Sequence, residues 1–315
     1  MNIQVMFQVL KSNIHAFGMT KGMRLTFNNY TRKYRKNFDI AEKYLEKRYK
    51  ATIEKYKVLE KNVSMSGYSV RAGRYIWALW LTGYNSAPEL VKKCSESLKK
   101  HSSGFEVILL DEKSINEYVD IPDYIWDKYY AGVIGPAHFS DIVRVKLLNK
   151  YGGVWLDAKV FLSGDFTTDI WNNRFYSPHR ISNQANYRIS IADRRWICGI
   201  MSTNIKNYLL FSFISEMYDL YWRDHSKAIV YLLLDTFIDI AVKNFINVKK
   251  DIESIPVTDD SYYSLSAVLN ETYDEDEWKR IMQATDIHIL STKIKLLESN
   301  STFYSVIVRN EKDYL

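Results

Sequence analysis

The sequence predicts an α/β fold in which a mostly parallel sheet is flanked by helices, with a helical extension at the N-terminus. From Arg74 onward, short apolar runs alternate with helix-forming segments, a pattern typical of parallel strands joined by crossover helices. Apolar residues make up 47% of the 315 residues and aromatic residues 15%, which is enough for a packed core. The run SMSGYSVRAG at 64–73 reads as a linker, so we predict a division into residues 1–70 and residues 71–315.

Residues 1–70 carry the basic charge of the chain. They hold 14 Lys and Arg against 5 Asp and Glu, a net charge of +9 in a chain whose total is +6. The segment 39–61 has no Gly or Pro and is rich in Ala, Glu, Lys and Tyr, which favours a helix. This charge fits attachment to an anionic membrane, but it is equally typical of a solvated lysine-rich helix. Nucleic acid is not expected as a partner, because the sequence contains no recognised nucleic-acid module.

The strands and helices of residues 71–315 follow one another in order. The run YIWALWL at 75–81 is short, apolar and followed by a glycine, as in a buried strand. Pro88 occupies the first turn of the next predicted helix. A double glycine ends the helix that precedes the run VWLDAKVF. The remaining predicted strands are 105–110 and 154–161, and the predicted helices are 89–100, 121–130, 138–150, 205–222, 227–245 and 275–284.

Several classes of protein are excluded by what the sequence lacks. The two cysteines, Cys94 and Cys198, are too few for a disulfide framework, which favours a reduced cytoplasmic compartment. The longest apolar stretch, 228–242, contains two aspartates and is too short to span a bilayer. We therefore expect neither a transmembrane helix nor a secretory signal. No phosphate-binding P-loop, nucleophile elbow or HExxH motif is present.

The helix predicted at 138–150 carries an unusual charged face. At about 100° per residue, Ser140, Asp141 and Arg144 fall within one arc together with two leucines, so this face is expected to turn inward. His138 falls on another side, where water is the expected neighbour, and is either a solvent-facing residue or a pocket residue. A buried carboxylate and guanidinium must be paired or bound to a ligand, because isolated burial is costly. Asp141 and Arg144 therefore form either a structural ion pair or the wall of a polar pocket.

The strand that follows brings a second set of polar side chains. Alternation places Trp155, Asp157 and Lys159 on one face of a continuous strand, with Asp157 near its carboxyl end, where open α/β sheets bind ligands. Asp235 lies in an apolar helix and is either a paired structural acid or part of a pocket wall. Lys293, in STKIKLL, is either a phosphate contact or a solvent-facing strand residue.

These motifs together resemble a known family. The run GPAHFSDIVRVKLLNKYGGVWLDAKV is similar to the signature of the capsular polysaccharide synthesis proteins, which are related to glycosyltransferase family 32 and its DXD sugar-binding segment. The run IWALWLTGYNSAPELVKKCSESLKK resembles the first strand and helix of the same family. The resemblance covers about residues 74–300 and implies a GT-A, Rossmann-like fold that transfers a sugar from a nucleotide sugar.

The resemblance also implies roles for individual residues. Nucleotide contacts are expected from the first strand and its loop, donor-sugar and phosphate contacts from the charged helix face, and catalysis from Asp157 and Asp235. Arginine suits phosphate because it binds two oxygens at once, and carboxylates accept hydrogen bonds from sugar hydroxyls. The full set of expected donor contacts is Trp77, Trp80, Gly83, Ser140, Asp141, Arg144, Gly153, Asp157, Lys159 and Lys293.

One position departs from the family pattern. Many DXD enzymes bind manganese or magnesium through two acids spaced by one residue, and here Asp157 is followed by Lys159. Asp157 remains the expected metal ligand if a metal binds. Lys159 either stabilises the diphosphate in place of the metal, or pairs with Asp157, or points away.

The function expected from these features is transfer of a hexose, with UDP-hexose as the expected donor, to a hydroxyl of a lipid-linked glycan. The relationship to family 32 suggests retention at the anomeric carbon. The enzyme would be cytoplasmic and peripheral to the inner face of the cell membrane, held there by residues 1–70. The alternative is a degenerate protein that binds nucleotide sugar, or organises a synthesis complex, without turnover.

Overall fold

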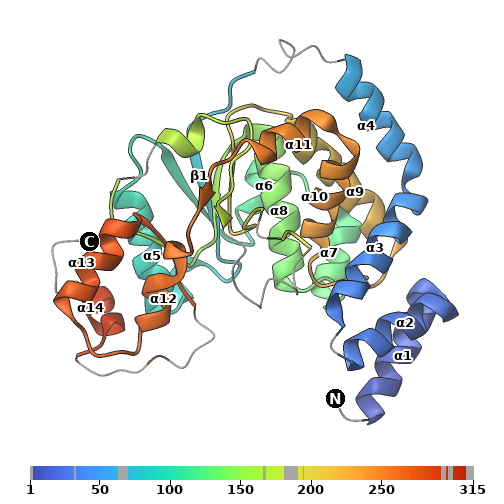
Figure 1. Cartoon of the computed structure of the whole chain (residues 1–315), viewed down its shortest axis with the longest axis horizontal. Coiled ribbons are helices and arrows are strands. Elements are labelled where there is room, and N and C mark those ends of the chain that lie inside the picture. Colours follow the sequence, from blue (N-terminus) through green and yellow to red (C-terminus); the bar gives the residue numbers. More distant parts are fainter. Residues whose placement is uncertain are drawn as a thin grey trace.

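The computed structural model describes residues 3–31, 33–62, 70–165, 168–180, 191–193, 195–291, 296 and 301–309. Its centre is a sheet with the strand order β2-β1-β3-β6, in which β1 pairs parallel with β2 and β3, and β3 pairs antiparallel with β6 (Figure 1). The strands of this sheet are β1 (Tyr75–Leu79), β2 (Glu106–Leu110), β3 (Gly153–Leu156) and β6 (Ile200–Thr203). Smaller pairs are formed by β4 (Val160–Leu162) with β8 (Ile287–Ile289), and by β5 (His179–Arg180) with β7 (Val257–Thr258).

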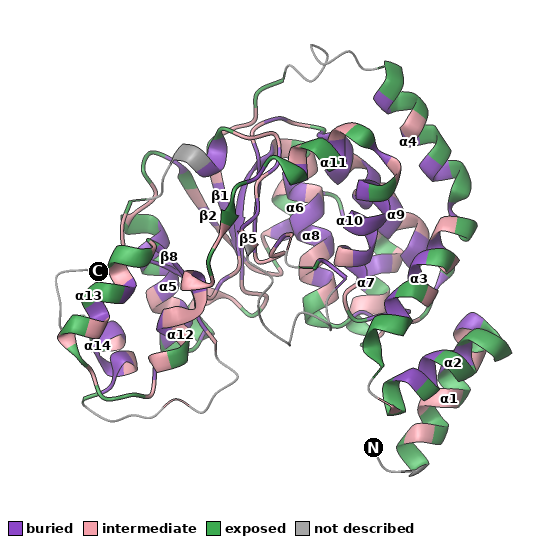
Figure 2. Cartoon of the chain, in the orientation of Figure 1, coloured by how far each residue is buried: buried purple, intermediate pink, exposed green. Residues whose placement is uncertain are grey.

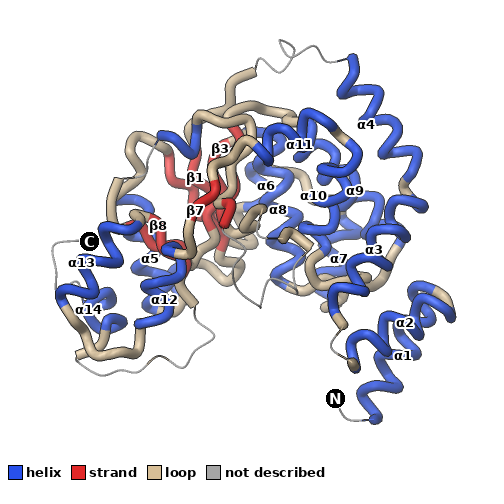
Figure 3. Tube along the Cα trace, in the orientation of Figure 1, coloured by secondary structure: helices blue, strands red, loops and turns tan. Residues whose placement is uncertain are grey.

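Helices cover both faces of this sheet, which confirms the predicted α/β class (Figure 3). On one side lie α5 (Glu89–Lys100), α12 (Ser264–Val268), α13 (Glu275–Ala284) and α14 (Phe303–Arg309). On the other lie α6 (Ile115–Tyr118), α7 (Asp123–Tyr130), α8 (Pro136–Tyr151), α9 (Leu209–Asp224), α10 (Leu233–Asn244) and α11 (Ile246–Glu253). Short 3-10 turns occur at Tyr84–Ser86, Thr168–Trp171 and Ser261–Tyr263. Among the described residues, no helix combines the length and apolar composition that crossing a bilayer requires.

Strand β1 shows how the sequence builds the two layers. Trp77 and Leu79 pack into the core on the α8 side, whereas Ile76 and Ala78 pack into a separate core that includes Leu98 of α5. These four of the five β1 residues are all buried, so this part of the strand is a continuous apolar run and does not alternate (Figure 2). Burial on both faces fixes the sheet as the middle layer of the fold.

The strand predicted at 154–161 is wrong in one respect. The chain leaves β3 after Leu156 and turns before β4 begins at Val160, whose N–H donates to the carbonyl of Asp157 at 2.8 Å. β3 belongs to the central sheet and β4 to another, because β4 pairs with β8. Asp157 and Lys159 therefore lie in a turn at the sheet edge and are not neighbours on one strand face.

The N-terminal region consists of four helices, α1 (Ile3–Phe17), α2 (Met19–Tyr30), α3 (Tyr34–Arg48) and α4 (Lys50–Asn62). The single helix predicted at 39–61 is interrupted at Tyr49, whose hydroxyl donates to Asp224, the last residue of α9, at 3.3 Å. Helices α3 and α4 run along the outer side of α9 and α10, with Leu45 and Ile53 buried in the main core. The α1–α2 hairpin extends beyond this body (Figure 1).

The helices predicted at 89–100 and 275–284 are found with the same bounds, as α5 and α13, and the remaining predicted helices are found with shifted ends. The helix predicted at 205–222 is α9, and the one predicted at 227–245 is α10, which begins only at Leu233. The segment 227–232 is irregular because the hydroxyl of Tyr221 donates to the carbonyl of Lys227 at 2.6 Å and accepts from the N–H of Ile229 at 2.8 Å. Residues of this irregular segment line the cavity at the carboxyl ends of β1 and β3.

Candidate active site

A cavity lined by several charged and polar side chains lies at the carboxyl ends of β1 and β3. The strand order reverses between these two strands, since β2 lies on one side of β1 and β3 on the other, and such switch points are where open α/β sheets bind ligands. The cavity measures about 670 Å³. Its lining comes from the residues after β1 and β3, from one face of α8 and from the start of α10, and includes Trp80, Thr82, Ser140, Asp141, Arg144, Asp157, Lys159, Cys198, Tyr231 and Asp235.

Arg144 is the charged centre of this pocket. Its side chain is only 5% exposed, and its two terminal nitrogens contact Asp141 Oδ1 at 3.1 Å and Asp157 Oδ1 at 2.9 Å. Its guanidinium also lies over the ring of Trp155, 4.9 Å from the ring centre. Burial alone would lower the pKa of Arg144, but the two carboxylates more than offset it, so the pKa is raised and the charge is fixed. Its Nε is buried with no hydrogen-bond partner among the described atoms.

Asp157 is held in place from three directions. Its Oδ1 accepts from Trp155 Nε1 at 2.8 Å as well as from Arg144, and its own N–H donates to the carbonyl of Gly199 at 2.9 Å. Gly199 passes so close that a Cβ added there would lie 2.8 Å from Asp157 Oδ2. The carboxylate is 38% exposed and opens onto the pocket. A pre-positioned, partly exposed carboxylate can accept hydrogen bonds without reorganising.

Two further carboxyls of the pocket are strongly desolvated. Desolvation raises the pKa of Asp141 to about 7, against the opposing attraction of Arg144. Desolvation also raises the pKa of Asp235, which Trp196 Nε1 partly offsets by donating a hydrogen bond at 2.9 Å. Burial, reinforced by Asp235, raises the pKa of the neighbouring Cys198 thiol. The pocket therefore combines an arginine that stays charged with buried acids that hold their protons more tightly than free ones do.

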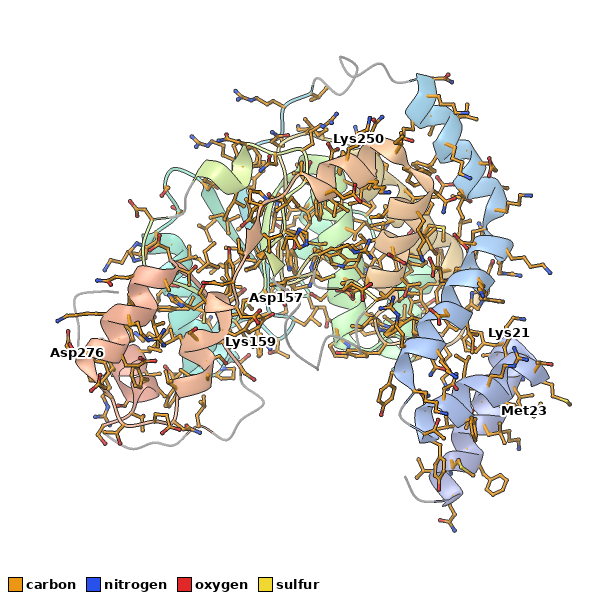
Figure 4. The ribbon with its side chains drawn as sticks, in the orientation of Figure 1. Lys21, Met23, Asp157, Lys159, Lys250 and Asp276 are labelled. Atoms are coloured by element: carbon orange, nitrogen blue, oxygen red, sulfur yellow. The ribbon has the colours of Figure 1, made fainter. Side chains whose placement is uncertain are left out.

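Lys159 lines the same pocket from the turn after β3, close to Asp157 near the middle of the molecule (Figure 4). Among the described residues, no carboxylate lies within ion-pair distance of its ammonium group. The same described residues contain no group of three or more His, Cys, Asp or Glu side chains that could hold a metal ion. With Asp157 Oδ1 engaged by Arg144 and Trp155, the residues present do not form a metal site by themselves.

Not every residue singled out in the sequence reaches the pocket. Trp77 is fully buried and donates to the carbonyl of Gly152 at 2.9 Å, so its indole packs in the core instead of lining the cavity. Gly153 lies at the opposite end of β3, packed against Trp77. Gly83 has a φ of 82° and follows the lining residue Thr82, without lining the cavity itself. Lys293 lies outside the described residues.

Sequence reasoning missed several residues that the structure brings to the pocket. Cys198 and Gly199 precede β6, in a stretch without a clear periodic pattern, and only the antiparallel pairing of β6 with β3 places them beside Asp157. Tyr231 reaches the pocket through the irregular segment before α10. His138, which the sequence left as either a solvent-facing or a pocket residue, lines the pocket, with Nε2 lying 2.6 Å from the Tyr231 carbonyl. Its helical angle gave no sign of this contact, because the covering segment is distant in sequence.

The family model for capsular polysaccharide synthesis proteins matches residues 22–307, most of the chain. The chain belongs to the capsular polysaccharide synthesis protein family. This match confirms the resemblance drawn from the sequence motifs and extends it into α2, well before residue 74.

Two curated relatives of this capsular polysaccharide synthesis protein are glycosyltransferases. The O-glycosyltransferase braB of Annulohypoxylon truncatum is 29% identical over 114 residues, which cover 33% of this chain and 27% of the relative. The glycosyltransferase afumC of Aspergillus fumigatus is 28% identical over 108 residues, covering 31% of this chain and 28% of the relative. The chain thus spans little more than a quarter of the length of these relatives.

Two solved structures are also similar in outline. The PaToxG glycosyltransferase aligns with 80% of this chain and 99% of its own at 12% identity and a TM-score of 0.35. The apo form of the glycosyltransferase GlyE from Streptococcus pneumoniae TIGR4 aligns with 76% of this chain and 62% of its own at 15% identity and a TM-score of 0.34. Superpositions this loose do not define a shared active site.

Proposed function

We propose that this capsular polysaccharide synthesis protein is a glycosyltransferase that takes a hexose from a nucleoside diphosphate, with UDP-hexose as the expected donor. The observation that carries the proposal is the Asp141–Arg144–Asp157 cluster at the switch point of the sheet. A cavity of about 670 Å³ falls within the usual range for small-molecule sites. Family membership and the glycosyltransferase relatives support the same reaction class.

The charges of the pocket suit the two ends of such a donor. The diphosphate is anionic, and Arg144 and Lys159 are the cations that line the cavity among the described residues. Asp141, Asp157 and Ser140 supply oxygens that accept hydrogen bonds from sugar and ribose hydroxyls. Positive charge at the departing phosphate stabilises the charge that develops as the bond to the sugar breaks.

We assign catalytic roles to Asp157 and Asp235. Asp157 is paired with Arg144, and its carboxylate can stabilise positive charge developing on the donor sugar. Asp235, whose pKa is raised by desolvation, can take the proton from the attacking acceptor hydroxyl. Transfer with retention of the anomeric configuration is part of the proposal, on the strength of the relationship to family 32.

In this proposal the ammonium group of Lys159 stabilises the negative charge of the diphosphate, a role that a divalent metal has in DXD enzymes. Its ammonium has no carboxylate partner among the described residues and lies on the pocket wall. We therefore expect manganese or magnesium to be dispensable for the reaction.

The acceptor in this proposal is a hydroxyl of a lipid-linked glycan at the inner face of a cell membrane. The basic N-terminal helices support this location, because a cationic surface is drawn to anionic lipids. Co-sedimentation with phosphatidylglycerol vesicles at low and moderate salt tests the attachment, and binding that is equal with neutral phosphatidylcholine vesicles refutes it.

Slow hydrolysis of the donor tests the central proposal without knowledge of the acceptor. A panel of UDP-hexoses is incubated with the protein, and released UDP is measured over hours. At least one donor is expected to be hydrolysed, and Asp157→Asn is expected to lower the rate by about a hundredfold or more. Binding of donors with no turnover in any mixture would instead support the non-catalytic alternative.

The role of Lys159 is tested in the same assay. Hydrolysis is expected to persist in EDTA, whereas Lys159→Met is expected to reduce it by about a hundredfold. Lys99→Met, which removes an exposed lysine on α5, is the matched control and is expected to change nothing. Complete loss of activity in EDTA, restored by manganese, would refute the metal-independent reaction.

A further inference from the structure

A second cavity, of about 860 Å³, lies against the first and on the side of the N-terminal helices. It is enclosed by α1, α2 and α3 on one side and by the segment 227–232 and the start of α8 on the other. The two cavities share a wall, since both are lined by Pro136, Ala137, His138, Tyr231 and Leu232. Any molecule in this second cavity therefore lies directly beside the pocket assigned to the donor.

The second cavity, here called the groove, is lined mainly by apolar side chains. Its apolar side chains come from all the enclosing elements: Val9, Leu25, Phe38, Val133, Ile229 and Val230. The polar lining residues include asparagines, and no Asp or Glu lines the groove among the described residues. A groove of this composition favours an extended apolar ligand over a sugar or a nucleotide.

One cation is present in the groove. Lys227 Nζ donates to Asn13 Oδ1 at 2.7 Å and to Ser12 Oγ at 3.2 Å, and both acceptors are neutral. Among the described residues it has no carboxylate partner, and desolvation lowers its pKa. A half-buried ammonium without a counter-ion is costly, and an anionic ligand at this position would remove that cost.

The outer surface of the α1–α2 hairpin indicates where such a ligand comes from. Phe7, Met19, Met23 and Phe27 are each 46% to 68% exposed, an unusual concentration of apolar side chains in contact with water. The first 38 residues contain no Asp or Glu, while Lys21 and other basic side chains lie among the exposed apolar ones (Figure 4). Apolar side chains beside basic ones on a helical hairpin are typical of a surface that lies in a membrane interface.

We propose that the groove beside the donor pocket binds the phosphate-bearing hydrocarbon chain of a membrane lipid, with the phosphate on Lys227. This inference rests on the proposed transferase function, since it makes the lipid the carrier of the acceptor hydroxyl. The hairpin contacts the membrane through its exposed apolar residues, and the lipid enters the groove that the hairpin helps to enclose. The shared wall at His138 and Tyr231 is where the acceptor sugar passes to the donor pocket.

Calorimetric titration of the full chain with monomeric farnesyl phosphate tests this groove directly. Binding is expected to weaken at least about tenfold in Lys227→Gln, because one charge-assisted contact is lost, and to be retained in Lys227→Arg. Val133→Trp, which fills the groove from its partly buried edge, is expected to abolish binding while the thermal unfolding midpoint stays close to that of the parent. Lys99→Gln on α5 is the matched charge control and is expected to bind normally.

Two related probes separate the lipid from other phosphates. Farnesol is expected to bind more weakly than farnesyl phosphate and to be insensitive to Lys227→Gln, and inorganic phosphate is expected not to compete. Farnesyl phosphate binding that is unaffected by both Lys227→Gln and Val133→Trp, or that inorganic phosphate displaces, would overturn the proposal. Donor hydrolysis measured without lipid tests the first pocket independently. If hydrolysis is absent while farnesyl phosphate binding depends on Lys227, the transferase proposal fails and the lipid groove stands.

Discussion

The two adjoining cavities handle charge in opposite ways. In the donor pocket, Arg144 is held between two carboxylates and over an indole ring before any ligand binds. In the groove, the described neighbours of Lys227 that its ammonium contacts are the neutral oxygens of Ser12 and Asn13. The charges of the donor pocket are already paired and need not reorganise when the donor binds. The ammonium of Lys227, in contrast, has no counter-ion until an anionic ligand binds.

This difference follows from where the two cavities lie in the fold. The donor pocket is built on β1, β3 and α8, which are buried at the centre of the molecule, so its side chains are fixed by packing (Figure 2). The groove is enclosed by helices at the periphery, and α1 and α2 contact the body mainly along this one boundary. A charge network at the centre is therefore expected to contribute to stability as well as to binding, while the groove contributes to binding alone.

Removing the central cation should have the largest effect. Arg144→Met leaves Asp141 and Asp157 facing each other without a cation, which is expected to cost about 3–5 kcal/mol in the free energy of unfolding. Donor hydrolysis should fall by at least about a hundredfold. Urea denaturation and the UDP-release assay measure the two effects. Arg280→Met, which removes a solvent-exposed arginine paired with Glu277, is expected to leave both unchanged. An Arg144→Met variant that is as stable and as active as the parent would contradict the expectation that the charges of the donor pocket contribute to both stability and binding.

A smaller change displaces Asp157 without removing any charge. The Cβ of Gly199→Ala would lie 2.8 Å from Asp157 Oδ2, so the carboxylate must move away from Arg144 and Trp155. Donor hydrolysis is expected to fall by about a hundredfold, the effect of misplacing a reacting group by about 1 Å. Stability should fall by only about 1 kcal/mol. Gly164→Ala is a matched control, since its Cβ would lie 2.4 Å from Asp286 Oδ1 outside the pocket. It should lose similar stability and keep its activity, and equal losses of activity in both variants would count against the role of Asp157.

The smallest effect concerns pH. Because the pKa of Asp141 is raised to about 7 in the folded state, the folded protein holds a proton on this carboxyl that the unfolded chain has already released. Its contribution to stability is therefore present at low pH and declines as the pH rises towards 7. The asparagine of Asp141→Asn does not titrate. The free energy of unfolding of the variant, relative to that of the parent, should therefore rise by about 1–2 kcal/mol between about pH 5 and pH 7 and should not rise further above that range. Denaturant midpoints of both proteins, measured across this range, check the sign. A parent that becomes more stable relative to the variant as the pH rises would contradict it.

Much of the candidate site could be read from the sequence because it is local. The spacing of Asp141 and Arg144 on one helical turn requires only a helix, and that helix is found as α8. An apolar strand that carries Asp157 near its carboxyl end was also predicted, although the strand ends at Leu156 and does not continue to residue 161. Trp77 shows the limit of such reasoning, since β1 alternates between two buried faces and only packing decides which side chain reaches the pocket.

By itself the sequence determined the class of fold, the order of its main strands and helices, and the charged helix face, because apolar periodicity and glycine or proline punctuation act within a few residues. The tertiary structure alone decided that β3 and β4 separate at Asp157, that Gly199 and Tyr231 join the pocket, and that α3 and α4 pack into the main core. It also created the groove around Lys227, whose walls are separated by about two hundred residues of chain. Contacts over such separations depend on how whole layers pack, and no local pattern encodes that arrangement.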